Sequence, residues 1–135
     1  MNTFLILVAL LSMWWPWSSG KTYHMAGSTS VPAASATVKV QRDKDNGNTR
    51  LDIKVQHLAK PSSLTPPAST YLVWARPRGG TAVKLGAIGV GDDLKGELKT
   101  VTVLKDFELL ITAEQSETAP APSDVQIFHV YVTLS

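Results

Sequence analysis

The chain opens with an unbroken apolar run that separates it into two unlike parts. Residues 4–11 read FLILVALL, and a WWPW stretch follows at residues 14–17. From Ala36 onward, apolar and polar residues alternate in short stretches that are separated by turn-forming residues. Alternation with a period of two is typical of half-buried β-strands. The contrast predicts a small β domain that is carried out of the cytoplasm behind an N-terminal leader.

The leader has the apolar length of a signal peptide, although residues 1–3 contain no Lys or Arg. Ser18 and Gly20 stand at the positions that a signal peptidase reads. An uncleaved anchor is the alternative, but a membrane span takes about 20 apolar residues and residues 4–17 supply fewer. We therefore expect a leader helix over residues 1–20 that is a signal peptide or an N-terminal anchor, with a buried helix as the least favoured interpretation.

Composition limits the classes of function that remain. The chain has 135 residues, and about 100 of them follow the leader and a loose stretch, which is enough for one domain. It contains no Cys, which excludes disulfides, Fe–S clusters, cysteine-ligated zinc and blue copper. The net charge is +2 with both signs interspersed, whereas nucleic-acid binding needs a clustered basic face. We therefore expect no nucleic-acid partner.

The strongest local signal is a hairpin at Asn46-Gly47, because this dipeptide tolerates the positive φ angles of a tight turn. A strand over Thr37–Arg42 precedes it, and a strand over Thr49–His57 follows it. In the second strand the apolar residues alternate with charged and polar ones, so one face of the sheet is expected to be wet. The residues expected to face inward are Leu51, Ile53 and Val55.

The rest of the chain supplies further strand signals. Residues 60–69 contain three prolines and are expected to be a crossover between sheets, because proline donates no ladder hydrogen bond. The next strand is apolar on both faces, which indicates a central position, and it carries Trp74. A change of phase near Thr100 predicts a β-bulge. The expected strands are Thr70–Ala75, Thr81–Ile88, Leu94–Leu104, Phe107–Ala113 and Val125–Leu134.

About seven antiparallel strands within this length predict an all-β fold, an immunoglobulin-like Greek-key sandwich. The sandwich is expected over residues 36–135, with Trp74 buried between its two layers. Residues 21–35 are rich in Ser, Gly, Ala, Thr and Pro, and they are expected to form a flexible linker.

Three stretches together carry a family resemblance. They are YLVWA at residues 71–75, KLG at residues 84–86, and FELLITAE at residues 107–114 with PAPS at residues 120–123. This pattern resembles the extracytoplasmic C-terminal domain of anti-sigma-K-type factors and related uncharacterised bacterial exported proteins. The resemblance covers residues 70–124 and implies a sandwich fold in an extracytoplasmic setting. It does not imply sigma-factor sequestration, because only leader residues precede the sandwich where such factors have a cytoplasmic helical domain.

No motif points to catalysis or to a cofactor. His57 and His129 would bind a metal only if their strand ends met. The acidic residues at 92–93 and at Glu114 and Glu117 lack the repeating spacing of a calcium loop. No serine stands in a nucleophile elbow. We therefore expect no catalytic, cofactor-binding or metal-binding residue, and a small hydrolase or a His-based metal-binding protein is less favoured.

Two loops are the candidate contact regions, because β-sandwiches often present binding residues on loops. Arg76 and Arg78 form the one local basic cluster, and Lys84 follows nearby. Glu114 and Glu117 begin the polar loop before the last strand. These five residues are the candidate partner-binding residues.

The function expected from these observations is that of a non-enzymatic binding module of the cell envelope, periplasmic or secreted. Its partner is expected to be a protein or another envelope component, and membrane contact is expected only through the N-terminal segment. The alternative is a structural or assembly component that residues 4–17 tether to the membrane.

Overall fold

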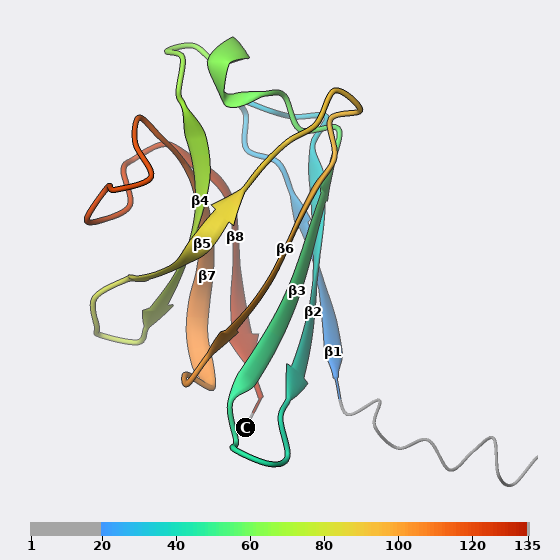
Figure 1. The fold of residues 1–135 in the computed structure, drawn as a ribbon, viewed down its shortest axis with the longest axis vertical. Helices are drawn as coiled ribbons and strands as arrows, with labels where there is room; N and C mark the ends of the chain where they lie inside the picture. Colours follow the sequence, from blue (N-terminus) through green and yellow to red (C-terminus); the bar gives the residue numbers. More distant parts are fainter. Residues whose placement is uncertain (1–19, 135) are drawn as a thin grey trace, which may run out of the picture.

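The computed structural model describes residues 20–134, which form two four-stranded antiparallel sheets (Figure 1). One sheet has the strand order β1-β2-β3-β6, and the other has the order β5-β4-β7-β8. A short 3-10 helix, η1 (Pro61–Ser63), lies in the crossover between the sheets. The strands are β1 (Lys21–Ala26), β2 (Ser35–Arg42), β3 (Thr49–Gln56), β4 (Thr70–Pro77), β5 (Val83–Ile88), β6 (Gly96–Thr102), β7 (Asp106–Glu114) and β8 (Gln126–Thr133).

The hydrophobic core lies between the two sheets, as the alternating sequence predicted. Leu51, Ile53 and Val55 on β3 are buried, and the charged residues between them lie on the outer side of the sheet. The facing sheet contributes the alternate residues of β4 and β7. These are Tyr71, Val73 and Ala75 on β4 and Phe107, Leu109, Ile111 and Ala113 on β7. The prediction of two facing apolar layers is confirmed.

The β2–β3 hairpin is also confirmed. Gly47 has φ 74°, a left-handed conformation that glycine adopts without steric cost. The Asp43 N–H donates to the Asn48 carbonyl over 2.8 Å and closes the turn. The strands then pair without interruption from Arg42 opposite Thr49 to Ser35 opposite Gln56.

Trp74 is buried, but it does not lie between the sheets. It is 1% exposed and packs with Leu72 and Leu110 on the outer side of the β5-β4-β7-β8 sheet. The reason is the period of the strand: because Val73 and Ala75 point into the core, Leu72 and Trp74 must point away from it. The predicted burial is therefore confirmed, and the predicted place of the indole between the layers is wrong.

The predicted flexible linker over residues 21–35 is wrong for its first part. Strand β1 pairs with β2 from Lys21 opposite Val40 to Ala26 opposite Ser35, and Met25 is buried in the core. The Tyr23 hydroxyl donates to the Thr133 carbonyl over 3.2 Å, which joins β1 to β8 of the other sheet. The six residues of β1 were not recognised as a strand because the whole stretch is rich in small and polar residues. The described part of the chain therefore has eight strands, where about seven were predicted.

The predicted bulge near Thr100 is also wrong. Strand β6 pairs with β3 in one continuous register, and Thr100 points inward while Val101 is 54% exposed. The apparent change of phase arises because a polar residue faces in and an apolar one faces out. The inward Thr100 hydroxyl donates to the Leu85 carbonyl of β5 over 3.2 Å. Register shifts occur instead between Val73 and Trp74 and between Ile111 and Thr112.

The expected leader falls mostly outside the described residues, so its helix, its cleavage and its membrane contact stay predictions. Within residues 20–134, no helix has the length and apolar character that a membrane crossing requires.

Candidate binding surface

The predicted basic cluster is divided by the structure. Arg76 lies near the end of β4 and forms a charge-assisted pair with Glu108 on β7, with Nη2–Oε1 and Nε–Oε1 distances of 2.5 and 3.1 Å. His129 on β8 places its Nδ1 3.7 Å from the other oxygen of Glu108. Arg78 lies in the turn after β4 and is exposed. The guanidinium of Arg76 is therefore already engaged within the sheet.

Lys84 contacts two parts of its own chain. Its ammonium group donates a hydrogen bond to the Glu117 carbonyl and lies 5.5 Å from the ring centroid of Trp74. A cation over an indole face is attracted by the ring quadrupole. Lys84 thus links β5 to the loop at residues 115–125 and shields the indole. The side chain of Glu117 itself is exposed.

Glu114 is only 6% exposed and ends a buried hydrogen-bonded chain. The Trp74 Nε1–H donates to the Thr112 hydroxyl over 2.8 Å, and that hydroxyl donates to Glu114 Oε2 over 2.5 Å. The Ser123 N–H donates to the same oxygen over 2.8 Å. Buried polar groups that are paired in this way fix the segments that they join. The carboxylate of Glu114 therefore ties the 115–125 loop to the sheet.

The five candidate residues do not converge on one site. Lys84, Glu114 and Glu117 hold the 115–125 loop that covers Trp74, whereas Arg76 is paired with Glu108 and Arg78 lies in the turn beyond β4. That these residues bind a partner stays a prediction.

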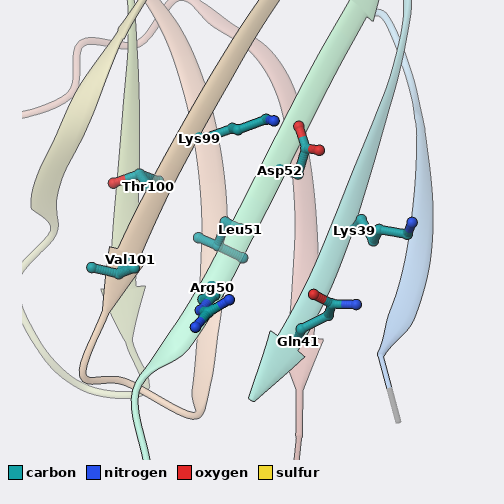
Figure 2. A pocket seen from close by; sticks show the side chains of 8 residues that line it. All are labelled: Lys39, Gln41, Arg50, Leu51, Asp52, Lys99, Thr100 and Val101. Carbon is teal, nitrogen blue, oxygen red and sulfur yellow. The ribbon is translucent and has the colours of Figure 1, made fainter. Parts of the chain in front are cut away.

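The structure shows a further candidate surface that the sequence analysis did not predict. We call the outer side of the β1-β2-β3-β6 sheet the polar face. It carries a hollow of about 630 Å³ (Figure 2). Its outward side chains come in pairs from three neighbouring strands because alternate residues of a strand point to the same side. They are Lys39 and Gln41 from β2, Arg50 and Asp52 from β3, and Lys99 and Val101 from β6.

Strand register arranges these side chains in rows. Asp52 is paired with Lys39 of β2 on one side and with Lys99 of β6 on the other. Figure 2 shows the carboxylate of Asp52 between these two lysines. The next row has Arg50 between Gln41 and Val101. Adjacent strands lie about 4.8 Å apart, so each row spans about 10 Å.

The charges of the polar face are only partly paired. Arg50 Nη2 lies 2.9 Å from Asp43 Oδ2, and the pKa of Asp43 is lowered by a hydrogen bond from the Asp45 N–H and by this guanidinium. Among residues 20–134, neither Lys39 nor Lys99 has an acidic partner within 4.0 Å. Asp52 Oδ1 is buried and lacks a hydrogen-bond partner within the same residues. One row therefore has three charged groups that no described residue pairs.

Only the register assembles this row, which explains why the sequence did not reveal it. The alternation of β3 correctly places Arg50 and Asp52 on the outer side, where charged residues are expected anyway. Lys99, however, is almost fifty positions further along the chain. No local pattern predicts that β6 pairs with β3 so that Lys99 lies opposite Asp52.

The histidines lie apart in the sandwich, His57 after the end of β3 and His129 on β8 of the other sheet. Within residues 20–134, no three His, Asp or Glu side chains form a group that could hold a metal ion. Comparison with known proteins finds no family model that matches the chain and no curated protein with a significant match. The resemblance to anti-sigma-K-type factors therefore stays a prediction.

Proposed function

We propose that this chain is an exported, non-enzymatic β-sandwich module that binds a component of the cell envelope through its polar face. The observation that carries the proposal is the hollow of about 630 Å³, where Lys39, Asp52 and Lys99 have charged side chains without partners among the described residues. Unpaired charges on a rigid sheet are pre-organised for a ligand, because little further ordering is needed on binding.

Connectivity supports an immunoglobulin-like assignment. The chain changes sheets between β3 and β4, between β5 and β6, and between β6 and β7, while β3 pairs with β6 and β7 lies between β4 and β8. In the immunoglobulin fold, strands B and E pair in one sheet and strands C, F and G form the other. Strands β3 and β6 correspond to B and E, and β4, β7 and β8 correspond to C, F and G. Strand β1 is an addition at the edge.

Export is supported by the apolar run at residues 4–11 and by the position of the first strand. Cleavage after Gly20 would leave the described strands intact, because β1 begins at Lys21. Mass spectrometry of the chain from fractionated cells tests this part. A mature chain that begins at Lys21 outside the cytoplasm is expected. A chain that still begins at Met1 in the cytoplasmic fraction would contradict export.

Site-specific photocrosslinking in cells tests binding. A benzophenone side chain at Gln41, on the polar face, is expected to give one discrete adduct. The matched control is the same group at Gln126, an exposed position on the outer side of β8. Equal adducts from both positions would contradict binding through the polar face. A broad pattern of envelope adducts would favour the structural or assembly role instead.

A further inference from the structure

We propose that the ligand of the polar face is an acidic oligosaccharide, held by Lys39, Asp52 and Lys99. The inference rests on the proposed function and adds the chemical class of the ligand. Acidic groups of the ligand meet the two lysines, and a sugar hydroxyl donates to Asp52.

The first argument is the mixed chemistry of one row. Lys39 and Lys99 carry ammonium groups with no acidic partner within 4.0 Å among the described residues. Asp52 lies between them and has a buried acceptor with no donor. A buried acceptor without a donor destabilises the folded chain, so it needs an explanation. A ligand that supplies both anions and a hydroxyl donor satisfies all three groups.

The second argument is spacing. Lys39 and Lys99 belong to strands on either side of β3, so their backbones lie about 10 Å apart. A sugar unit within a chain is about as long as the distance between neighbouring strands, about 4.8 Å. In a chain of acid sugars that lies across the strands, units two apart therefore bring their acidic groups to the two lysines, while the unit between them turns its acidic group outward and its hydroxyl groups toward Asp52.

The third argument is the exclusion of other ligand classes. Neutral glycans are usually held by stacking on aromatic rings, and the side chains that line the hollow include no aromatic residue. A continuous polyphosphate has no hydroxyl to donate and would be repelled by the carboxylate of Asp52. A cationic ligand would meet Lys39, Arg50 and Lys99.

The neighbouring row extends the site. Arg50 is paired with Asp43, but its side chain is 60% exposed and a guanidinium has five N–H donors. Gln41, across the strand pair from Arg50, adds an amide that both donates and accepts. This row offers further hydrogen bonds to hydroxyl or carboxylate oxygens of the same ligand.

Calorimetric titration of the full chain with three probes tests the inference. Oligogalacturonate has both carboxylates and hydroxyls, polyphosphate has anions alone, and maltohexaose has hydroxyls alone. Oligogalacturonate is expected to bind most tightly. Lys39→Ala and Lys99→Ala are each expected to weaken its binding about tenfold, since each removes one charge-assisted contact. The matched control is Lys105→Ala, an exposed lysine in the turn before β7, which should change the affinity less than twofold.

Asp52→Ala gives the sharpest discrimination because the two probes should respond in opposite directions. Loss of a negative charge favours any polyanion, so polyphosphate should bind more tightly. Loss of the acceptor should weaken oligogalacturonate about tenfold. Asp52→Asn keeps an acceptor oxygen and is expected to bind oligogalacturonate better than Asp52→Ala does, and it serves if the alanine variant does not fold.

Several outcomes would overturn the inference. If Asp52→Ala strengthened the binding of both probes, the polar face would be a plain polyanion surface. If no probe bound while the crosslink from Gln41 persisted, the ligand class would be wrong and the proposed function would stand. If binding and the discrete crosslink were both absent, the proposed function would fail as well.

Discussion

The outer sides of the two sheets differ in what the chain places over them. On the β5-β4-β7-β8 sheet, Leu72, Trp74 and Leu110 point outward, and Ala119 of the 115–125 loop packs against them. On the β1-β2-β3-β6 sheet the outward residues are mostly charged or polar, and a hollow remains open. The same alternation produces both sides. The type of residue at the outward positions therefore decides whether the chain must cover a sheet or can leave it free.

The two sides also differ in how their polar groups are satisfied. Over Trp74 the polar groups pair within the chain, from the indole through Thr112 to Glu114 and on to the Ser123 N–H. On the polar face Asp52 has an acceptor with no donor among the described residues. A closed network stabilises its own fold, whereas open groups are available to a ligand. We therefore expect substitutions on the covered side to change stability and those on the polar face to change binding.

The largest expected effect is that of Trp74→Ala on the covered side. Removal of a buried indole is expected to lower the free energy of unfolding by about 3–5 kcal/mol, because contacts are lost and a cavity remains. Urea denaturation measures this change. The control is Val101→Ala on the polar face, which should stay within about 0.5 kcal/mol because the side chain is mostly exposed. A similar loss for both variants would remove the contrast between the two sides.

The inward side of β4 provides a pH-dependent comparison. Burial raises the pKa of Tyr71 to about 12, and its hydroxyl donates to the Ala59 carbonyl over 2.5 Å. The unfolded chain ionises this phenol from about pH 10, before the folded chain does, so stability should fall between about pH 10 and pH 12 by roughly 2–3 kcal/mol. Denaturation across this range measures the fall. In Tyr71→Phe the fall should be smaller, and an equal fall would show that another group is responsible.

Glu114→Ala is expected to have a smaller effect on stability, confined to the 115–125 loop that covers Trp74. Without the carboxylate, the Ser123 N–H and the Thr112 hydroxyl lose their acceptor, at a cost of about 1–3 kcal/mol. Hydrogen exchange should show faster exchange at the Ser123 amide, while the amides of β3 keep their protection. Glu117→Ala is the matched control, because that side chain is exposed and its contact to Lys84 uses the backbone carbonyl. Unchanged exchange at Ser123 in Glu114→Ala would show that the carboxylate does not hold the loop.

Much of the fold follows from patterns within single strands. The alternation of Leu51, Ile53 and Val55 predicts their burial, and Asn46-Gly47 predicts the hairpin, because both depend only on neighbouring residues. Strand β1 was missed because its six residues lie in a stretch whose Ser, Gly and Pro content is typical of linkers. Local composition therefore gives less information where a strand is short and lies at the edge of a sheet.

The candidate site was harder to predict because it depends on pairing between distant strands. Arg76 and Lys84 stood out in the sequence, yet both are engaged within the chain. Lys39, Asp52 and Lys99 have the ordinary character of outward strand residues. Their combination has meaning only in the register of β2, β3 and β6. A sequence pattern thus predicts which side a residue takes, but not which residues it meets there.

The smallest expected effect is that of the exposed pair on the polar face, Arg50 with Asp43. The pKa of Asp43 is lowered in the folded chain, so its contribution to stability is present above the ordinary carboxyl pKa and is lost as the pH falls through the folded value. Asp43→Asn should therefore remove a small part of the loss of stability between about pH 5 and pH 3. Thermal unfolding at low and high salt measures it, and high salt should reduce the difference between the variants. If Asp43→Asn destabilised the chain as much as Glu114→Ala at neutral pH, the polar face would be part of the structural framework, and the distinction between a closed side and an open one would not hold.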